Sequence, residues 1–200
     1  MEQLPRSFFE RYTPYVAKDL IGCRLVRVID DVRLAGIIVE TEAYRGRGDP
    51  ASHAFRGRTK RNEVMFGEAG HAYVYFTMGM HYCLNVTTER PGEAGAALLR
   101  AVEPVEGADE MALNRGPRRG GHIADGPGRL TEAMDIDGRL NGEDLVTSPA
   151  LFIEGGSRQG RIMRSARVGV SRGTERRWRF FAAESRFVSK GRPSSTAQNP

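Results

Sequence analysis

The sequence has few cysteines and lysines, no long hydrophobic run and no secretory start. Its two cysteines, Cys23 and Cys83, are too few for a disulfide scaffold. The first residues are charged and contain no apolar segment of the kind that a signal peptide requires. Aliphatic runs such as 37–39 are far too short to cross a membrane. These absences predict a cytoplasmic protein without a membrane partner.

Signatures of bound metals and cofactors are also missing from the sequence. The four histidines form no HExxH motif, and neither cysteine belongs to a CxxC pair. The glycine-rich segments 67–70 and 126–128 lack the GK[ST] sequence that a phosphate-binding loop needs. We therefore expect no metal ion and no cofactor.

The charge that is present is mostly arginine. Lysine and arginine together number 30 against 25 acidic residues, which gives a formal net charge of +5, and only three of the 30 are lysine. Arginine binds phosphate with two parallel hydrogen bonds, so three basic runs, 56–61, 115–119 and 172–179, predict a surface that follows a polyanion. A GC-rich genome would also favour arginine over lysine, and each run alone is typical of a solvated face.

A chain of 200 residues predicts one domain, with mixed α+β patterning. We expect this domain to span residues 1–188, followed by a disordered tail from Ser189 to Pro200 because of its polar composition. The segment 45–70 reads as a long surface loop, which in a compact domain is usually functional. A capping box at Ser7 and a proline after Thr13 predict two short N-terminal helices. Further helices are expected at 107–113 and 129–134, and strands at 23–29, 34–44, 72–78, 81–88, 95–102, 151–153, 164–170 and 178–182.

The strand 34–44 carries an unusual acidic face. Its alternation places Glu40, Glu42 and Tyr44 on one side of the sheet. Two neighbouring carboxylates repel each other, so one reading is a solvated edge strand and the other is a carboxylate kept for chemistry. Their carboxyl groups would lie about 6–7 Å apart, a spacing that also admits a carbohydrate glycosidase. We expect Glu40 to be structural and paired with an arginine, and a helper role stays open.

Aromatic residues follow in the next strand. Tyr73 and Tyr75 share a face, and with Tyr44 they would form a slot for a flat ligand. Nucleic-acid bases stack on such side chains. The strand ends at an apolar turn, Met78–Met80, of the kind that wedges between base steps.

These residues and several others carry a resemblance to a known family. The chain resembles the alkyladenine (3-methyladenine) DNA glycosylases from Ser7 to about Val188. The resemblance implies a single α+β domain with a curved, mainly antiparallel β-sheet flanked by short helices and long loops, similar to the C-terminal domain of formyltransferases. The matching segments are 16–22, 39–44, 72–75, 79–85, 98–104, 126–128, 167–170 and 178–180.

The resemblance also implies roles for single residues in hydrolysis. Glu42 matches the general base that activates a water molecule. Arg100 and the backbone carbonyl of Val168 match the groups that help to hold this water. No lysine accompanies the motif, so the resemblance implies a simple hydrolase without strand-cleaving lyase activity.

A second set of matches concerns the bound base and the DNA. The walls of the base pocket correspond to Tyr44, His53 and Tyr75, and Asn85 matches the residue that crowds the exocyclic amine of guanine. The DNA wedge falls at Met78, where the best-known members carry tyrosine, with Met80 beside it.

Together these matches imply a monofunctional DNA glycosylase of base excision repair. It would flip alkylated or deaminated purines, such as 3-methyladenine, 7-methylguanine, hypoxanthine and ethenoadenine, out of duplex DNA and release them by hydrolysis. We expect damaged duplex DNA as the partner, a monomer as the working form and an association with the nucleoid. A module that binds damaged DNA without catalysis is the alternative.

Overall fold

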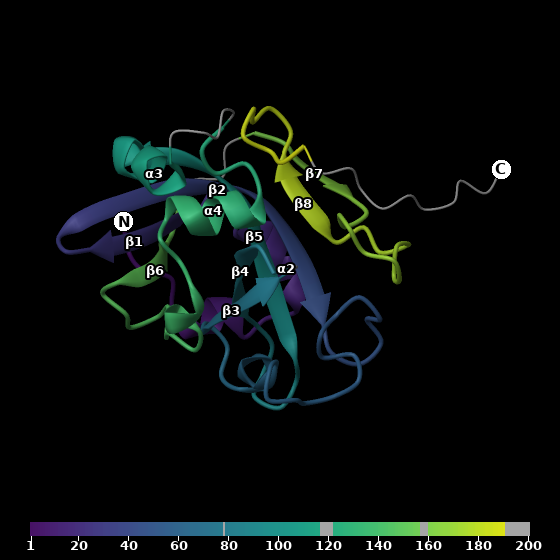
Figure 1. Cartoon of the computed structure of the whole chain (residues 1–200). Helices are drawn as coiled ribbons and strands as arrows, with labels where there is room; N and C mark the ends of the chain where they lie inside the picture. Colours follow the sequence, from purple (N-terminus) through teal and green to yellow (C-terminus); the bar gives the residue numbers. More distant parts are fainter. Residues whose placement is uncertain (78, 117–121, 157–159, 191–200) are drawn as a thin grey trace.

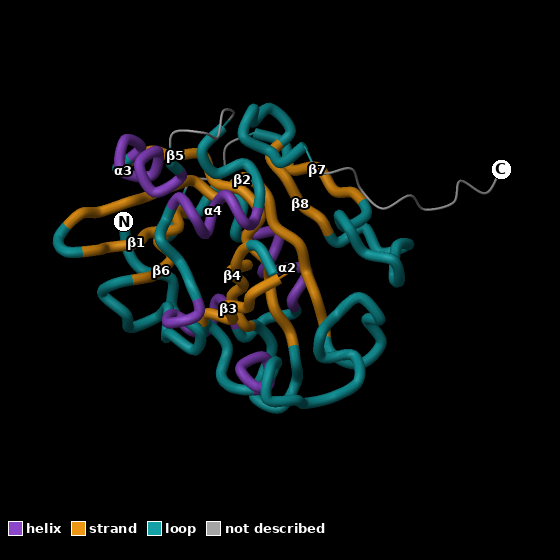
Figure 2. The backbone as a smooth tube through the Cα atoms, viewed as in Figure 1, coloured by secondary structure: helices purple, strands orange, loops and turns teal. Residues whose placement is uncertain are grey.

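The structure is a computed structural model that describes residues 1–77, 79–116, 122–156 and 160–190. Short helices and long loops surround one curled β-sheet (Figures 1 and 2). The elements in chain order are α1 (Arg6–Phe9), α2 (Thr13–Asp19), β1 (Arg24–Ile29), β2 (Val32–Arg45), η1 (Glu63–Phe66), β3 (Ala72–Thr77), β4 (His81–Thr87), β5 (Gly95–Glu106), α3 (Ala108–Arg115), α4 (Pro127–Ala133), η2 (Gly138–Leu140), β6 (Leu151–Glu154), β7 (Ile162–Ser165) and β8 (Arg179–Ala182).

Strand β2 organises the sheet. The strands follow the order β3-β4-β5-β2-β1-β6, with β8 pairing β2 and β7, and every pairing among the described strands is antiparallel. Along one edge of β2, residues 32–37 pair with β1, whereas 40–42 pair with β8. Its other edge pairs with β5 along most of its length. The expected curved, mainly antiparallel α+β domain is confirmed.

The β2–β5 ladder is irregular beside the acidic face. The register runs from Glu40 opposite Ala101 to Thr41 opposite Leu99, so Arg100 has no direct partner across the ladder. Such a bulge bends the strand and re-aims a side chain, and bulges are common beside functional sites. Here the bulged residue is the arginine that contacts both carboxylates of β2.

Helix α2 packs against one face of the sheet, and the acidic side chains of β2 project from the other face. It buries Val16 and Ala17, and the Thr41 hydroxyl donates a hydrogen bond of 2.6 Å to the Ala17 carbonyl. Because side chains alternate along a strand, Glu40 and Glu42 project from the opposite face. Both are fully buried, so the interpretation of this face as a solvated edge is wrong. The strand is flanked by β5 and β8 at this point, and neither carboxylate reaches solvent.

Three local expectations are wrong. The first helix begins after Pro5, and no side chain caps it, so Ser7 forms no capping box. Strand β7 ends at Ser165, five residues before the expected end at Val170. Ser189, expected at the start of a disordered tail, is 8% exposed and hydrogen-bonded to the sheet. Met78, part of the basic run 115–119 and the tail segment 191–200 lie outside the described residues.

No helix within the described ranges is long and apolar enough to cross a membrane.

Candidate active site

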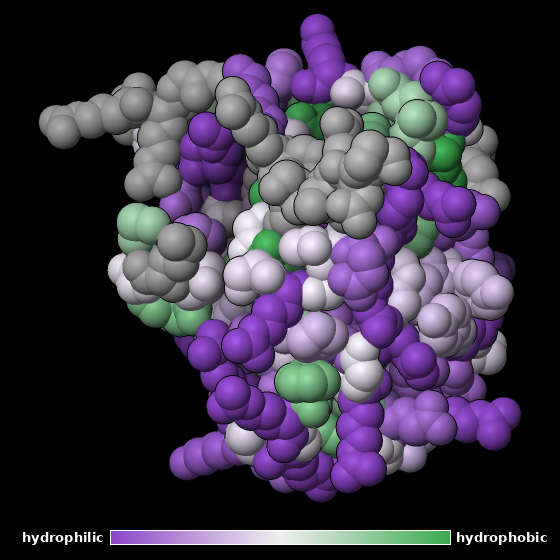
Figure 3. Space-filling view, turned by 90° about the vertical axis from the view of Figure 1, so that its right-hand side faces the viewer, coloured by the Kyte–Doolittle hydropathy of each residue, from purple (hydrophilic) through white to green (hydrophobic). Residues whose placement is uncertain are grey.

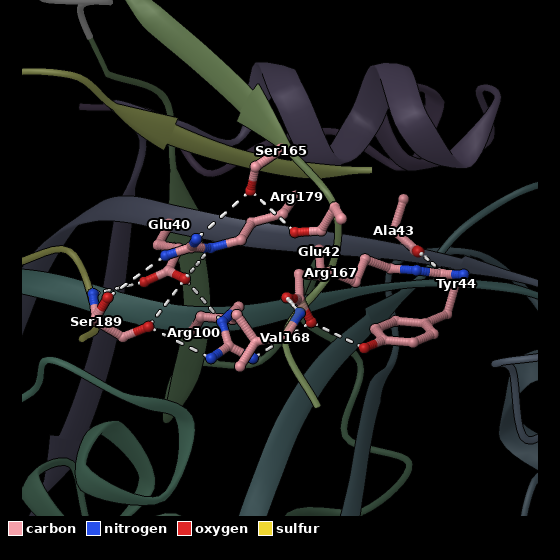
Figure 4. A network of polar contacts seen from close by, with 11 residues as sticks. Glu40, Glu42, Ala43, Tyr44, Arg100, Ser165, Arg167, Val168, Arg179 and Ser189 are labelled. Atoms are coloured by element: carbon pink, nitrogen blue, oxygen red, sulfur yellow. Dashed lines mark hydrogen bonds and ion pairs between the residues drawn. The ribbon is translucent and has the colours of Figure 1, made fainter. Parts of the chain in front are cut away.

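Glu42 lies at the centre of a buried set of polar contacts (Figure 4). One carboxylate oxygen, Oε2, accepts hydrogen bonds from the Tyr44 hydroxyl at 2.8 Å and from Arg100 Nη1 at 3.2 Å. The other, Oε1, accepts the backbone N–H of Val168 at 2.7 Å. An ionised carboxylate offers about four acceptor positions. Three protein donors therefore leave Oε1 with capacity for one more hydrogen bond, for example from a water molecule.

The segment after β7 brings Val168 to this carboxylate. The chain leaves the strand at Ser165 and turns at Gly169, whose φ of 70° lies in the left-handed region that favours glycine. The Val168 amide is the group that contacts Glu42. The role that the resemblance implies for the Val168 carbonyl, which is to help hold a water molecule, stays a prediction.

A second carboxylate, Glu40, lies behind Glu42. Arg100 joins the two, because its Nε donates to Glu40 at 2.8 Å while its Nη1 reaches Glu42. Arg179 from β8 adds a bond of 2.7 Å to Glu40. Burial disfavours the charged form of Glu40, but Arg100 and Arg179 outweigh it and lower its pKa below the ordinary value. Glu40 is therefore an anion paired with arginine, as the sequence analysis expected.

A pocket of about 160 Å³ opens on the other side of Tyr44. The four residues expected to bind a base all line it: Tyr44, His53, Tyr75 and Asn85. Its other walls come from the loop after β2, from η1, from β3 and β5, and from the segment after β7. They are Ala51, Ser52, Met65, Tyr73, Ala96 and Val170.

The aromatic groups of the pocket are electrically neutral. His53 lies edge-on to Tyr75 with ring centroids 4.6 Å apart, and its Nδ1 lies 2.9 Å from the Tyr73 hydroxyl. Partial desolvation, and then the nearby charge of Arg61, lower the pKa of His53. Burial raises the pKa of Tyr73 to about 12 and raises that of Tyr75 further. At neutral pH the pocket thus presents uncharged imidazole and phenol rings.

Buried polar side chains order the long loop that carries His53. Asn62 donates to the His53 carbonyl at 2.9 Å and to the Gly57 carbonyl at 3.0 Å. On the opposite wall, the Asn85 amide nitrogen donates to the Tyr73 carbonyl at 3.0 Å. Both sides of the pocket are thus fixed by hydrogen bonds to the backbone.

Sequence reasoning missed a fully buried ion pair behind Tyr44. Arg167 makes two hydrogen bonds of 2.7 Å to Asp49, and a third of 2.9 Å to the Ala43 carbonyl. Its guanidinium lies 4.7 Å from the centre of the Tyr44 ring. The pair links the loop after β2 to the segment after β7 and supports Tyr44 from outside the pocket. The Arg167–Val168 sequence held the only hint, since it lies in a segment that matches the family.

The basic runs divide into buried and exposed arginines. Arg115 and Arg179, expected on a phosphate-binding surface, are instead buried and paired with Glu132 and Glu40. In contrast, the loop after β2 and the segment before β8 carry exposed basic residues. These are Arg47, Arg56, Arg58, Lys60, Arg61, Arg172 and Arg177.

These two exposed segments meet beside the pocket. Arg176 donates to the Gly48 carbonyl, which connects them, and Arg61 lies 5.3 Å from the centre of the Tyr75 ring. The face of the molecule in Figure 3 is mostly hydrophilic, with hydrophobic side chains confined to separate patches. Among the described residues, no group of three or more histidine, cysteine or acidic side chains is placed to hold a metal ion.

Fold and site together define a class: a single α+β domain in which a buried carboxylate adjoins a neutral aromatic pocket. Residues 7–186 match the family model described as methylpurine-DNA glycosylase, and the chain belongs to this family of N-glycosyl hydrolases. A protein of Carboxydothermus hydrogenoformans is 48% identical over 189 residues, which cover 94% of this chain and 98% of the relative. One of Methanocella arvoryzae is 48% identical, covering 96% and 98%, and one of Salinibacter ruber is 46% identical, covering 97% and 100%. All three carry the provisional name 3-methyladenine DNA glycosylase.

Proposed function

We propose that this protein is a monofunctional DNA glycosylase that releases alkylated or deaminated purines from duplex DNA by hydrolysis. The substrate class comprises 3-methyladenine, 7-methylguanine, hypoxanthine and ethenoadenine. Membership of the methylpurine-DNA glycosylase family supports the reaction class. The observation that carries the proposal is the position of Glu42, whose Oε2 accepts the hydroxyl of a tyrosine that lines the aromatic pocket.

In the proposed reaction Glu42 takes a proton from a water molecule, which attacks the sugar carbon as the base leaves. Arg100 and the Val168 amide hold the carboxylate in place, and the remaining acceptor position on Oε1 receives the water. A purine alkylated at N3 or N7 is already cationic and leaves readily. A neutral purine such as hypoxanthine needs a proton as it leaves, so it is the harder substrate.

The pocket suits an extrahelical purine ring. A base inside a duplex is out of reach, so the nucleotide must rotate out at a cost of a few kcal/mol, which is lower for damaged pairs. Stacking on aromatic rings returns about 1–3 kcal/mol per base. Tyr44, His53 and Tyr75 line the pocket and would offer such faces, and Asn85, which lines it too, would crowd the exocyclic amine of guanine.

The turn after β3 supports a wedge that fills the space left by the base. Met80 is 68% exposed, and Phe76 on the same hairpin is 50% exposed. Exposed apolar side chains at a tight turn suit insertion between base steps. The exposed arginines beside the pocket would contact the flanking phosphates. We infer a monomer bound to nucleoid DNA as the working form.

The decisive experiment compares wild type with Glu42→Gln on a duplex that contains one hypoxanthine or one 7-methylguanine. Wild type is expected to release free base without cutting the strand, whereas Glu42→Gln binds the same duplex but releases base at least about 100-fold more slowly, as expected for a lost general base. Glu106→Gln, an exposed carboxylate that does not line the pocket, serves as the matched control.

Two outcomes separate the alternatives. A binding module without catalysis predicts tight capture of lesion DNA and no base release by wild type. Equal rates for wild type and Glu42→Gln would remove Glu42 from the role of general base while leaving the glycosylase activity itself in place.

A further inference from the structure

Glu40 is coordinated more completely than Glu42, although it does not line the pocket. Its Oε1 accepts hydrogen bonds from Arg100 Nε at 2.8 Å, Arg179 Nε at 2.7 Å and Ser189 Oγ at 3.0 Å. Its Oε2 accepts the backbone N–H of Ser189 at 2.7 Å (Figure 4). These four donors arrive from β5, from β8 and from the C-terminal segment, so three distant parts of the chain meet on one buried carboxylate.

Ser189 closes this arrangement from the C-terminal side. Besides its two bonds to Glu40, its hydroxyl lies 3.3 Å from Arg100 Nη2, and its carbonyl lies 3.4 Å from Arg179 Nη2. The residue is 8% exposed. Glu40 and Ser189 therefore hold Arg100 by two of its three nitrogens, Nε and Nη2, while Nη1 faces Glu42.

The planarity of guanidinium gives this contact a consequence for Glu42. Arginine and carboxylate pair most favourably through two parallel hydrogen bonds, which would occupy both oxygens of Glu42. In the structure Arg100 gives Glu42 one bond of 3.2 Å, because its Nε and Nη2 are engaged with Glu40 and Ser189. Glu40 thereby competes with Glu42 for the same cation.

We propose that Glu40, Arg179 and Ser189 form a positioning network that restricts Arg100 to a single hydrogen bond with Glu42 and so keeps Arg100 from occupying Glu42 Oε1, the oxygen that would accept the water. The inference rests on the proposed function of Glu42 and adds three positioning residues to it. None of the three lines the base pocket. Their effect on the reaction passes through Arg100.

The cost of the network argues that it does more than hold the sheet together. It places two carboxylates and two guanidinium groups in a buried layer. Well-packed apolar residues of similar volume often stabilise a fold equally well or better than buried ion pairs. Apolar packing, however, could not fix the orientation of the Arg100 guanidinium, whereas these ion pairs do.

The test uses Ser189→Ala, which removes the hydroxyl contacts to Glu40 and Arg100 but keeps the backbone bond to Glu40. Base release from a hypoxanthine duplex is measured in single turnover as a function of pH. With Arg100 released toward Glu42, the plateau rate is expected to fall about tenfold, which corresponds to about 1.4 kcal/mol. The acid limb is expected to shift to lower pH, because a second guanidinium bond favours the ionised carboxylate.

Several charged or titratable groups surround Glu42, and the Ser189→Ala substitution replaces none of them. They are Tyr44 and Glu40 on β2, Cys83 on β4, Arg100 on β5, Arg167 after β7 and Arg179 opposite on β8.

Two further variants complete the design. Ser189→Thr keeps the hydroxyl and is expected to restore both the rate and the pH profile. Ser185→Ala is the matched control, because Ser185 accepts the Phe187 amide in the same segment and does not touch the network. A lower rate for Ser189→Ala without a shifted acid limb, or without rescue by threonine, means a structural role only and overturns the proposal.

A measurement that needs no activity separates this inference from the proposed function. The side-chain NMR signals of Arg100, assigned by comparison with Arg100→Lys, are expected to move in Ser189→Ala and to stay in place in Ser185→Ala. If wild type releases no base from any lesion duplex, the proposed function fails, and the NMR result still decides whether Ser189 holds Arg100. Unmoved Arg100 signals in Ser189→Ala overturn the network.

Discussion

The two regions that meet at Tyr44 differ in charge: one consists of ionised side chains and the other of neutral ones. Beside its hydroxyl lies a buried charged layer, in which Glu40 and Glu42 are matched by Arg100 and Arg179. Its ring lines the pocket, whose imidazole and phenol groups are neutral at pH 7. Hydrogen bonds fix the positions of the charged side chains, whereas the pocket leaves room for the flat ring of a ligand.

Tyr44 connects the two sides. Its ring lines the pocket, and its hydroxyl donates to Glu42 across the boundary. Burial, and then the negative charge of Glu42, raise its pKa well above the ordinary value, so it acts as a donor at every physiological pH. The pocket that would bind the base and the carboxylate that would accept the proton are thus separate groups, and the Tyr44 hydroxyl connects them by one hydrogen bond.

The largest expected effect comes from breaking the charged layer. In Arg100→Met, Glu42 loses its arginine partner and Glu40 keeps Arg179 alone, so we expect a loss of about 3–5 kcal/mol in the free energy of unfolding. Urea denaturation measures it.

Arg33→Met serves as the control, since Arg33 forms partly exposed ion pairs with Glu106 and Glu154. We expect it to cost at most about 1 kcal/mol. Equal losses for the two variants would contradict the view that Arg100 neutralises a buried layer.

The pocket side is expected to respond in binding more than in stability. Tyr75→Leu keeps apolar volume but removes the aromatic face, so affinity for lesion duplex should fall by about 1–3 kcal/mol. Fluorescence anisotropy in the Glu42→Gln background measures it without turnover. Tyr15→Leu, at a residue on α2 that is 64% exposed, is the control. An unchanged affinity for Tyr75→Leu would mean that no base stacks there.

Tyr44→Phe removes the hydrogen bond from Tyr44 to Glu42 but keeps the aromatic ring in the pocket. Because one hydrogen bond to a charged acceptor is lost, base release is expected to slow by about tenfold, equivalent to about 1.4 kcal/mol, with lesion affinity unchanged. Single-turnover rates and anisotropy on the same duplex provide the two numbers. A parallel loss of affinity would show that the hydroxyl serves the pocket as well.

The smallest effect is a two-step loss of stability in acid. The pKa of His53 is lowered from 6.5 in the fold, so the unfolded chain binds its proton first and stability falls as pH drops below about 6.5. The pKa of Glu40 is lowered from 4.5, so its contribution is complete above that value and is lost as pH falls through the folded pKa.

Unfolding free energies at a series of pH values separate the two steps. His53→Gln should remove the upper step only, and Glu40→Gln the lower step only. Loss of the lower step in His53→Gln, or of the upper step in Glu40→Gln, would contradict the assignment of the two steps to these residues.

Much of the local structure could be predicted from the sequence. Period-two alternation correctly placed Glu40, Glu42 and Tyr44 on one face of a strand, and the loop that follows does carry His53 to the pocket. These features depend on neighbours in the chain. The capping box at Ser7 failed because the helix Arg6–Phe9 begins one residue earlier and has only four residues.

The contacts between the site residues could not be predicted from the sequence and became visible only in the folded structure. Arg100, Val168 and Ser189 lie 58, 126 and 149 residues from the carboxylates they contact. Their approach depends on β5, on the turn after β7 and on the C-terminal segment packing around β2. No periodicity encodes such distances, and the resemblance supplied Arg100 and Val168 but not Ser189.

The sequence by itself determined which side chains share a face, where the aromatic residues cluster and that arginine dominates the basic charge. The tertiary structure alone decided that both carboxylates are buried, that Arg179 and Arg167 serve the interior, and that a residue near the C-terminus completes the layer. The physical reason is that alternation fixes the direction of a side chain, whereas its partners and its exposure are set by long-range strand pairing.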